Sequence, residues 1–359
     1  MTIRQTTGDP GVQVGARTIG PGEPVFIVAE AGVNHDGELE TALELVDAAA
    51  QAGADAVKFQ TFDPDELVSA GSDLASYQRR GVQGGNGQKE MLSRLRFGKD
   101  EHAAIVEHSR KRGIVFLSTP FDHGSAALLA RLGVPAFKVG SGELTNLPFL
   151  TELTRYSLPI LLSTGMSDLD EVGAAVDTIR GHGVPLVLFH CVSSYPAPDE
   201  EANLRAMDAM REAFGVPVGY SDHCLGLDVS LAAVARDACI LERHLTLDRE
   251  RPGPDHAMSM EPGELRELVE RVRALELTLG DGRKRPQPSE EELRIVARRS
   301  IVAARPLAAG ETLTIDALAI KRPGGGLAPD RLSSLVGARL TKALAADEQL
   351  TEAHLADRG

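Results

Sequence analysis

The segment PVGYSDHCLGLDVSLAAVARDACILERHLT (residues 217–246) contains the pattern that decides the fold. Two short apolar runs, 217–223 and 240–246, flank a stretch that we expect to be helical. Each run begins as a buried strand would and ends in titratable side chains. The first ends in Asp222 and His223, and the second passes through Glu242, Arg243 and His244. The question is why strands that belong in a core should end in charge.

The same alternation runs from residue 25 to about residue 278. The other apolar runs are VFIVAEAG (25–32), AVKFQT (56–61), IVFLST (114–119), AFKVGSG (136–142), PILLSTG (159–165) and LVLFHC (186–191). Amphipathic stretches such as ELETALELVDAAAQAG separate them, with Gly53 at the expected helix stop. Eight strand-then-helix units in this length predict an α/β fold, a (β/α)8 TIM barrel. A doubly wound open sheet is the alternative, but it usually has fewer strands.

The alternation stops at GDGRKRPQPSEEE (280–292), which is rich in Gly, Pro and charge. We therefore predict a barrel domain over residues 1–280, a linker over 281–297 and a small domain over 298–359. Residues 305–318 and 342–355 resemble each other, which predicts two similar halves related by pseudo-twofold symmetry. So small a domain has a thin core, and we expect it to lean on the barrel or on a neighbour.

Composition limits the partners. The net charge of −14 argues against a nucleic-acid or anionic membrane surface. No apolar run approaches the length of a membrane span. Cys191, Cys224 and Cys239 show no CxxC spacing and cannot all pair, so we expect a reduced, cytoplasmic protein.

In a TIM barrel the active site lies at the carboxyl ends of the strands. Polar residues end every predicted strand here, and that convergence is stronger evidence than any single motif. In chain order they are Glu30, Asn34 and His35; Lys58 and Gln60; Ser118 and Thr119; Lys138, Ser141 and Glu143; Ser163 and Thr164; His190, Ser193 and Tyr195; Ser221, Asp222 and His223; Glu242 and His244.

Lys58 and Lys138 are of the kind that bind a phosphate or a carboxylate, with hydroxyls from Thr119, Ser141 and Ser221. Alternatively, a lysine here pairs structurally with a neighbouring glutamate or forms a Schiff base, as in a lysine aldolase.

His223 and His244 end neighbouring strands, within reach of a shared ion. Two histidines make an incomplete metal site, which water, substrate or a carboxylate would complete. A hydrogen-bonded pair, or one histidine as a general base, is equally compatible with the spacing. Cys224 should face the other side of its strand and pack in the core.

Glu30 is a candidate acid, base or hydroxyl-binding group, or an ion-pair partner of Lys58. Asp255, in RPGPDH (251–256), either meets a ligand or is a turn residue.

An ordered series of motifs resembles the sialic acid synthase family, which joins phosphoenolpyruvate to a mannosamine-type sugar. The matching stretches are AEAGVNHDG (29–37), AVKFQTF (56–62), LSTPF (117–121), FKVGSGE (137–143), LSTGM (162–166), HCVSSYP (190–196), YSDH (220–223), ERHLTLD (242–248) and RPGPDH (251–256). IKRPGGGL (320–327) resembles that family's β-rich antifreeze-like (SAF) domain. The resemblance thus covers nearly the whole chain, although residues 71–90 match no motif.

The resemblance implies roles for the matched residues. The implied metal ligands are His223 and His244, with Mn²⁺ as the expected ion and Mg²⁺ or Co²⁺ as alternatives. The implied phosphoenolpyruvate site comprises Lys58, Gln60, Thr119, Lys138, Ser141, Glu143, Ser193 and Ser221. The implied sugar contacts are Glu30, Tyr195 and Asp255, together with Arg322 reaching into the partner subunit of a domain-swapped homodimer. Glu30, Lys58 and Lys138 would be the catalytic residues.

On this reading the product is a nonulosonic acid, formed with water and with release of phosphate by C–O cleavage. A lysine-dependent pyruvate aldolase on the same barrel remains an alternative. So does a carbohydrate-binding protein with a relic barrel, although a relic should have lost some of these histidines and lysines. The sequence leaves open the acceptor sugar and any role for Glu242.

Overall fold

The computed structural model describes residues 11–69, 72–73 and 87–356. It forms two compact units that divide between Gly280 and Asp281. Each unit has its own hydrophobic core, so each is described by itself.

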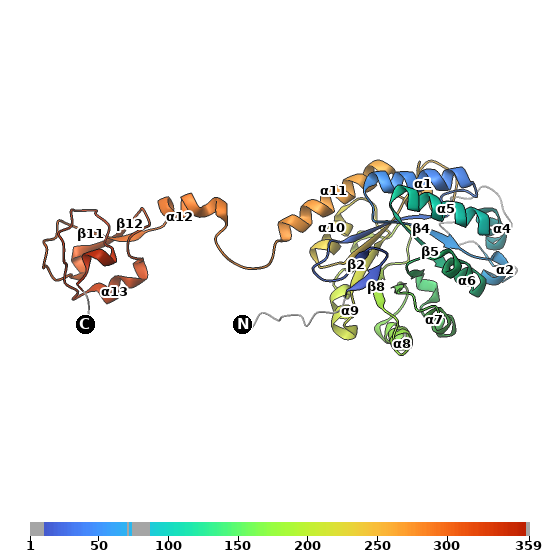
Figure 1. Ribbon diagram of the computed structural model, residues 1–359, viewed down its shortest axis with the longest axis horizontal. Helices are drawn as coiled ribbons and strands as arrows, with labels where there is room; N and C mark the ends of the chain where they lie inside the picture. Colours follow the sequence, from blue (N-terminus) through green and yellow to red (C-terminus); the bar gives the residue numbers. More distant parts are fainter. Residues whose placement is uncertain (1–10, 70–71, 74–86, 357–359) are drawn as a thin grey trace. The chain divides into compact units, whose positions relative to one another are not determined.

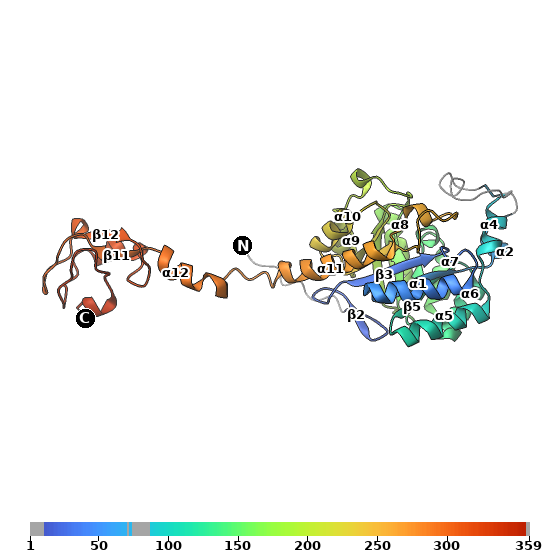
Figure 2. The ribbon, with the colours of Figure 1, turned by 90° about the horizontal axis from the view of Figure 1, so that it is seen from above.

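The first unit contains eight parallel strands (Figures 1 and 2). They are β3 (Phe26–Gly32), β4 (Ala56–Thr61), β5 (Val115–Pro120), β6 (Phe137–Val139), β7 (Ile160–Ser163), β8 (Leu186–Cys191), β9 (Val218–Asp222) and β10 (Ile240–His244). Their hydrogen-bonded order is β5-β4-β3-β10-β9-β8-β7-β6, and the end strands β5 and β6 lie side by side. The strands thus form a nearly closed barrel, and the (β/α)8 prediction is confirmed.

Helices follow the strands and surround the barrel (Figure 1). They are α1 (Leu39–Ala52), α2 (Pro64–Leu67), α4 (Gln88–Leu95), α5 (Lys99–Arg112), α6 (His123–Leu132), α7 (Leu147–Thr154), α8 (Leu169–Arg180), α9 (Ala206–Phe214), α10 (Asp228–Ala235) and α11 (Pro262–Leu279). In α1, Leu45, Val46 and Ala49 lie on the buried face. The helix stops at Gly53, whose φ of 85° is a left-handed conformation that glycine adopts without strain.

Two cores hold the barrel together. Outward-facing strand residues such as Val57 and Phe59 pack against the helices. Inward-facing residues such as Phe26 and Phe189 fill the barrel below the carboxyl ends of its strands. The hairpin of β1 (Val12–Val14) and β2 (Arg17–Ile19) adds further apolar side chains to this cluster. Because this end is filled with apolar side chains, polar residues can gather only at the opposite, carboxyl ends of the strands.

The second unit contains helices α12 (Glu291–Ala297) and α13 (Leu332–Leu335) and the antiparallel strands β11 (Ser300–Ala303) and β12 (Leu318–Lys321). Helix α12 lies within the predicted linker. The backbone supports the predicted twofold relation, since Leu307 and Leu344 exchange both of their hydrogen bonds at 2.9 Å. Matched pairs flank them: Leu313 donates to Ala338 as Leu350 donates to Ile301. The halves therefore pair around one approximate axis.

Candidate active site

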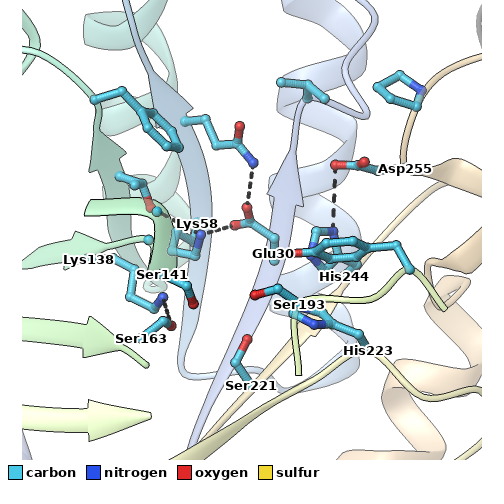
Figure 3. Close-up of a pocket in the computed structure, with 18 of the residues that line it drawn as sticks. Glu30, Lys58, Lys138, Ser141, Ser163, Ser193, Ser221, His223, His244 and Asp255 are labelled. Atoms are coloured by element: carbon cyan, nitrogen blue, oxygen red, sulfur yellow. Dashed lines mark hydrogen bonds and ion pairs between the residues drawn. The ribbon is translucent and has the colours of Figure 1, made fainter. Parts of the chain in front are cut away.

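The carboxyl ends of the barrel strands open into one cavity of about 580 Å³ (Figure 3). Every strand provides at least one lining side chain: Glu30 from β3, Lys58 and Gln60 from β4, Thr119 from β5, Lys138 from β6, Ser163 from β7, Cys191 from β8, Ser221 from β9, and Glu242 and His244 from β10. The segments beyond the strands add Ser141, Ser193, Tyr195, His223 and Asp255. The structure therefore brings most of the predicted site residues together.

Two lysines and two glutamates form a buried ionic cluster in this cavity (Figure 3 draws Lys58, Glu30 and Lys138). Lys58 Nζ lies 2.6 Å from Glu30 Oε2 and 3.9 Å from Glu242 Oε1. Lys138 Nζ lies 3.5 Å from the same Glu242 oxygen and donates to Ser163 Oγ at 2.6 Å. Because all four side chains are almost fully buried, each charge depends on the others for its stabilisation.

The sequence left Glu242 without a firm role beyond a possible ion pair with a lysine, and the structure places it close to both lysines. Its Oε1 also accepts a hydrogen bond from Ser221 Oγ at 3.1 Å. Strand alternation predicts that Glu242 and His244 face the same side of β10, and both line the cavity. Glu242 therefore completes a balanced set of two positive and two negative groups.

The environment shifts the pKa values of these four groups in different directions. Burial raises the pKa of Glu30 to about 7, although the charge of Lys58 opposes the shift. Burial also favours a neutral Glu242, but Lys138 and Lys58 outweigh it and lower the pKa of Glu242. Burial lowers the pKa of Lys138, whereas the two carboxylates outweigh burial at Lys58 and raise its pKa. Glu30 is thus the carboxylate that can exchange a proton near neutral pH.

Hydroxyl groups cover the side of the cavity above β6 to β8. Ser141 Oγ accepts a hydrogen bond from the Gly165 backbone at 2.9 Å and lies 3.2 Å from Cys191 Sγ. A Cβ at residue 165 would clash with Ser193 Oγ and lie 3.0 Å from Ser141 Oγ. Only glycine therefore lets these hydroxyls converge, beside Lys138, on a volume suited to an anion.

His223 and His244 lie together, with ring centroids 5.5 Å apart. His223 Nδ1 donates to the Val192 carbonyl at 2.7 Å, which leaves Nε2 with a free lone pair. His244 Nδ1 is buried and makes no hydrogen bond within the described residues; Asp255 Oδ2 lies 3.9 Å away. Burial lowers the pKa of both histidines, most strongly for His244, and so favours the neutral rings that metal ions require.

This donor set fits a metal ion that keeps open positions. Among the described residues no group of three or more His, Cys, Asp or Glu side chains could hold a metal. The two imidazoles would therefore need ligands from water or substrate, which a catalytic site allows. The unpaired ring nitrogen of His244 is the observation that favours such an ion over a simple hydrogen-bonded pair.

The side chains between these residues face outward. Arg243 and Asp222 are neighbours in the β9–β10 register, and their side chains form an ion pair of 2.5 Å. This pair does not line the cavity. Cys224 is fully buried in the hydrophobic core, as strand alternation predicted. The charged end of β10 thus divides into an inward pair, Glu242 and His244, and an outward arginine with its own partner.

Asp255 reaches the cavity from the loop after β10 (Figure 3). Its backbone carbonyl accepts a hydrogen bond from Ser259 Oγ at 2.6 Å, and burial raises the pKa of its carboxyl to about 6. The ring of Tyr195 lies 4.3 Å from that of His223 between centroids. The predicted sugar contacts on the barrel are therefore adjacent to the histidine pair.

Two predicted site residues do not line the cavity. Glu143 is not a lining residue, because its carboxylate accepts a hydrogen bond from Asn146 in its own turn at 2.7 Å. Arg322 is an exposed residue of the second unit, next to the end of β12. Within the segment 71–90, residues 71 and 74–86 lie outside the described residues.

The barrel, the cavity and the small second unit define a class of enzyme, and the comparisons agree. The chain belongs to the NeuB family, whose model matches residues 45–284, and a SAF domain matches residues 298–356. It is an enzyme of the N-acetylneuraminate synthase type. No helix in the described part of the chain is long and apolar enough to cross a membrane.

Individual relatives match over nearly their full length. The chain is 44% identical to the N,N'-diacetyllegionaminic acid synthase of Legionella pneumophila, across 95% of this chain and 97% of the relative. It is 33% identical to the human N-acetylneuraminate-9-phosphate synthase, across 94% of each chain. The crystal structure of a sialic acid synthetase from Leptospira borgpetersenii has a TM-score of 0.72 and 36% identity, covering 80% of this chain and 95% of that one.

Proposed function

We propose that this protein condenses phosphoenolpyruvate with an N-acylmannosamine-type aldose and water, giving a nonulosonic acid and phosphate. The observation that favours this reaction is the joint burial of two lysines and two histidines in one cavity. Anion-binding and electrophile-binding groups thus face the same space. The names of the relatives, which make legionaminic acid and N-acetylneuraminate 9-phosphate, support the same reaction class.

Lys58 and Lys138 would hold the phosphate and carboxylate of phosphoenolpyruvate. Thr119, whose Oγ1 lies 3.3 Å from Lys58 Nζ, would add a hydroxyl on one side. The remaining proposed contacts are Gln60, Ser141, Ser193 and Ser221, which line the cavity, and Glu143, which would reach it only by leaving Asn146.

The reaction forms one carbon–carbon bond at C3, and at C2 it forms a carbon–oxygen bond to water and breaks the carbon–oxygen bond to phosphate. C3 of phosphoenolpyruvate attacks the aldehyde carbon of the open-chain sugar, whose oxygen takes a proton and becomes a hydroxyl. Water adds to C2, and the C2–O bond then breaks, so phosphate leaves with the bridging oxygen and C2 becomes a ketone. Glu30, with its raised pKa, is suited to take the proton from that water. Lys58, 2.6 Å from Glu30, would then face a neutral carboxyl and be freer to bind the departing phosphate.

We also propose that His223 and His244 hold a divalent cation, Mn²⁺ rather than Mg²⁺ or Co²⁺. Such an ion supplies Lewis-acid polarisation of the sugar aldehyde. Asp255 and Tyr195 would orient the sugar beside this pair. Arg322 would reach the N-acyl group from the partner subunit of a domain-swapped homodimer.

Sugar-dependent release of phosphate from phosphoenolpyruvate tests the proposal. We expect release with N-acetylmannosamine or a related sugar, loss of release after chelation, and recovery with Mn²⁺. His223→Asn and His244→Asn should abolish the metal response but leave phosphoenolpyruvate binding intact. Full activity of either variant in chelator would contradict the metal assignment.

One observation favours a second candidate. The pKa of Lys138 is lowered by burial, as the amine of a Schiff-base lysine requires. A lysine-dependent pyruvate aldolase would form an adduct with pyruvate that borohydride traps on Lys138 or Lys58. Such trapping would favour the aldolase, whereas its absence together with phosphate release would exclude it.

A further inference from the structure

One wall of the cavity is apolar, in contrast to the polar strand ends. It rises from the segments that follow β3, β4 and β5, next to Glu30, Lys58 and Gln60. Its members are Val33, Leu67, Val68, Met91, Leu92, Leu95 and Phe121. The reaction proposed above gives these side chains no role.

The side chains of this wall are packed against one another. Met91, Leu92 and Leu95 lie on one face of α4 and are 5%, 8% and 8% exposed. They pack with Val33 and Phe62, and with the partly buried Leu67, Val68 and Phe121, into a small cluster separate from the main core. Their positions are therefore fixed before any substrate arrives, as a preorganised binding surface requires.

The described cations of this region pair with carboxylates that do not line the cavity. Lys89 pairs with Asp65 at 2.6 Å, Arg94 pairs with Glu90 at 2.5 Å, and Arg96 pairs with Asp63 at 3.0 Å. None of these three cationic side chains lines the cavity. Within the described residues, the lysines and arginines that line it are Lys58 and Lys138, which the carboxylate cluster already engages.

We infer that this wall determines the acceptor, and that it receives the apolar groups of an unphosphorylated, deoxygenated N-acyl sugar. The methyl groups of a 6-deoxy carbon and of acetamido substituents match an aliphatic surface, whereas the described residues of the wall offer a 6-phosphate no cation to offset its desolvation. Gln88, at the start of α4, is a lining residue that can bond an amide. The inference rests on the proposed condensation and selects among its acceptors.

Three sugars separate the possibilities: N-acetylmannosamine, its 6-phosphate, and a 2,4-diacetamido-2,4,6-trideoxymannose. Phosphate release is measured at saturating phosphoenolpyruvate. We expect kcat/KM for the trideoxy sugar to exceed that for N-acetylmannosamine by about tenfold or more, because each apolar group is worth about 10- to 200-fold in a fitted pocket. The 6-phosphate should be the poorest acceptor.

Substitutions in the wall test whether its side chains cause this sugar preference. Leu92→Asn and Met91→Gln keep side-chain size and add polarity, and each should lower the preference for the trideoxy sugar by about tenfold. The KM for phosphoenolpyruvate should not change. Phe62→Leu is the matched control, since Phe62 packs in the same cluster but does not line the cavity. It should lower thermal stability and leave the sugar preference as it was.

The outcomes are distinguishable. Preference for the 6-phosphate, or a sugar preference that the Met91 and Leu92 variants leave unchanged, would overturn the inference while the condensation itself stood. Phosphate release with none of the three sugars would overturn the proposed function, and the inference with it.

Discussion

At the scale of single residues, the site is a balanced charge cluster whose carboxylates differ in character. Glu30 has a pKa raised to about 7, while the pKa of Glu242 is lowered. The lowered pKa of Glu242 favours its ionised form, and its carboxylate lies close to both lysines. We therefore assign Glu242 to neutralising the lysines before substrate binds, and Glu30 to proton transfer.

Glu242→Gln tests this division. The substitution leaves two lysines with one carboxylate, so the cluster gains a positive charge and should bind phosphoenolpyruvate about tenfold more tightly. The unliganded protein should lose about 3 kcal/mol of stability, because a buried pair has lost a partner. Calorimetric titration with phosphoenolpyruvate and urea unfolding measure the two effects.

Glu30→Gln is the companion variant, and it removes less negative charge near neutral pH because the pKa of Glu30 is raised to about 7. It should also tighten phosphoenolpyruvate binding, but it should lower kcat by about a hundredfold or more through loss of the general base. Weaker phosphoenolpyruvate binding by Glu242→Gln, or equal losses of kcat in both variants, would contradict the division of roles.

The sequence could predict which residues face the cavity, but not how they pair. Alternation along each strand puts Lys58 with Gln60, and Glu242 with His244, on the inner side. Whether Glu30 pairs with Lys58 or contacts a ligand was left open, and the structure shows the ion pair at 2.6 Å. Pairing depends on side-chain reach across the barrel, which strand periodicity does not contain.

At the scale of elements, two loops far apart in the sequence hold Asp255 in place. Asp36, in the loop after β3, contacts His256 Nε2 at 3.0 Å, and His256 Nδ1 contacts Thr246 Oγ1 at 2.7 Å. Asn34 reaches Ser259 at 2.9 Å, and Ser259 in turn bonds the Asp255 carbonyl. The loop after β10 is thus anchored on both sides of the residue that enters the cavity.

Asp36→Asn should loosen this anchor without altering the backbone, because asparagine tolerates the left-handed φ of 55° found at residue 36. We expect the KM for the acceptor sugar to rise about tenfold, since misplacing a positioning group is costly. The dissociation constant of phosphoenolpyruvate should stay constant.

Arg251→Gln is the control for this prediction, because Arg251 bonds the other oxygen of the same carboxylate at 3.2 Å. It should have a smaller effect, as its partner stays bonded to His256. If Asp36→Asn leaves the KM for the sugar unchanged, the anchor is structural only.

The positions of the strands could be predicted because apolar runs mark them. The residues at which the strands end were harder to predict. The predicted run 136–142 is a strand only over Phe137–Val139, after which Ser141–Glu143 turns into a 3₁₀ helix. That turn directs Ser141 toward Gly165 and leaves Glu143 bonded to Asn146. The apolar face of α4 was not predicted, since its sequence matches no motif and its cluster forms only against side chains from the segments that follow β3, β4 and β5.

At the scale of the whole molecule, the chain consists of two units with separate cores. The second unit's core contains Ile301, Leu313 and Leu350 and is built around the paired halves described above. It keeps Arg322 exposed beside a glycine-rich turn, in a position available to another molecule. The proposed function uses this arginine to contact the acceptor sugar in the barrel of a partner subunit.

Subunit complementation tests that arrangement. One chain carries His244→Asn, which disables its barrel, and the other carries Arg322→Ala, which should raise the KM for the sugar far more than that for phosphoenolpyruvate. Each variant alone should turn over little at low sugar concentration. In a swapped dimer, the mixed pair combines the intact barrel of one chain with the intact Arg322 of the other, so random pairing should restore about a quarter of wild-type activity. Light scattering should show a dimer mass for both variants and for the mixture. A monomer mass, or a mixture no more active than Arg322→Ala alone, would show that each arginine does not serve its partner's barrel.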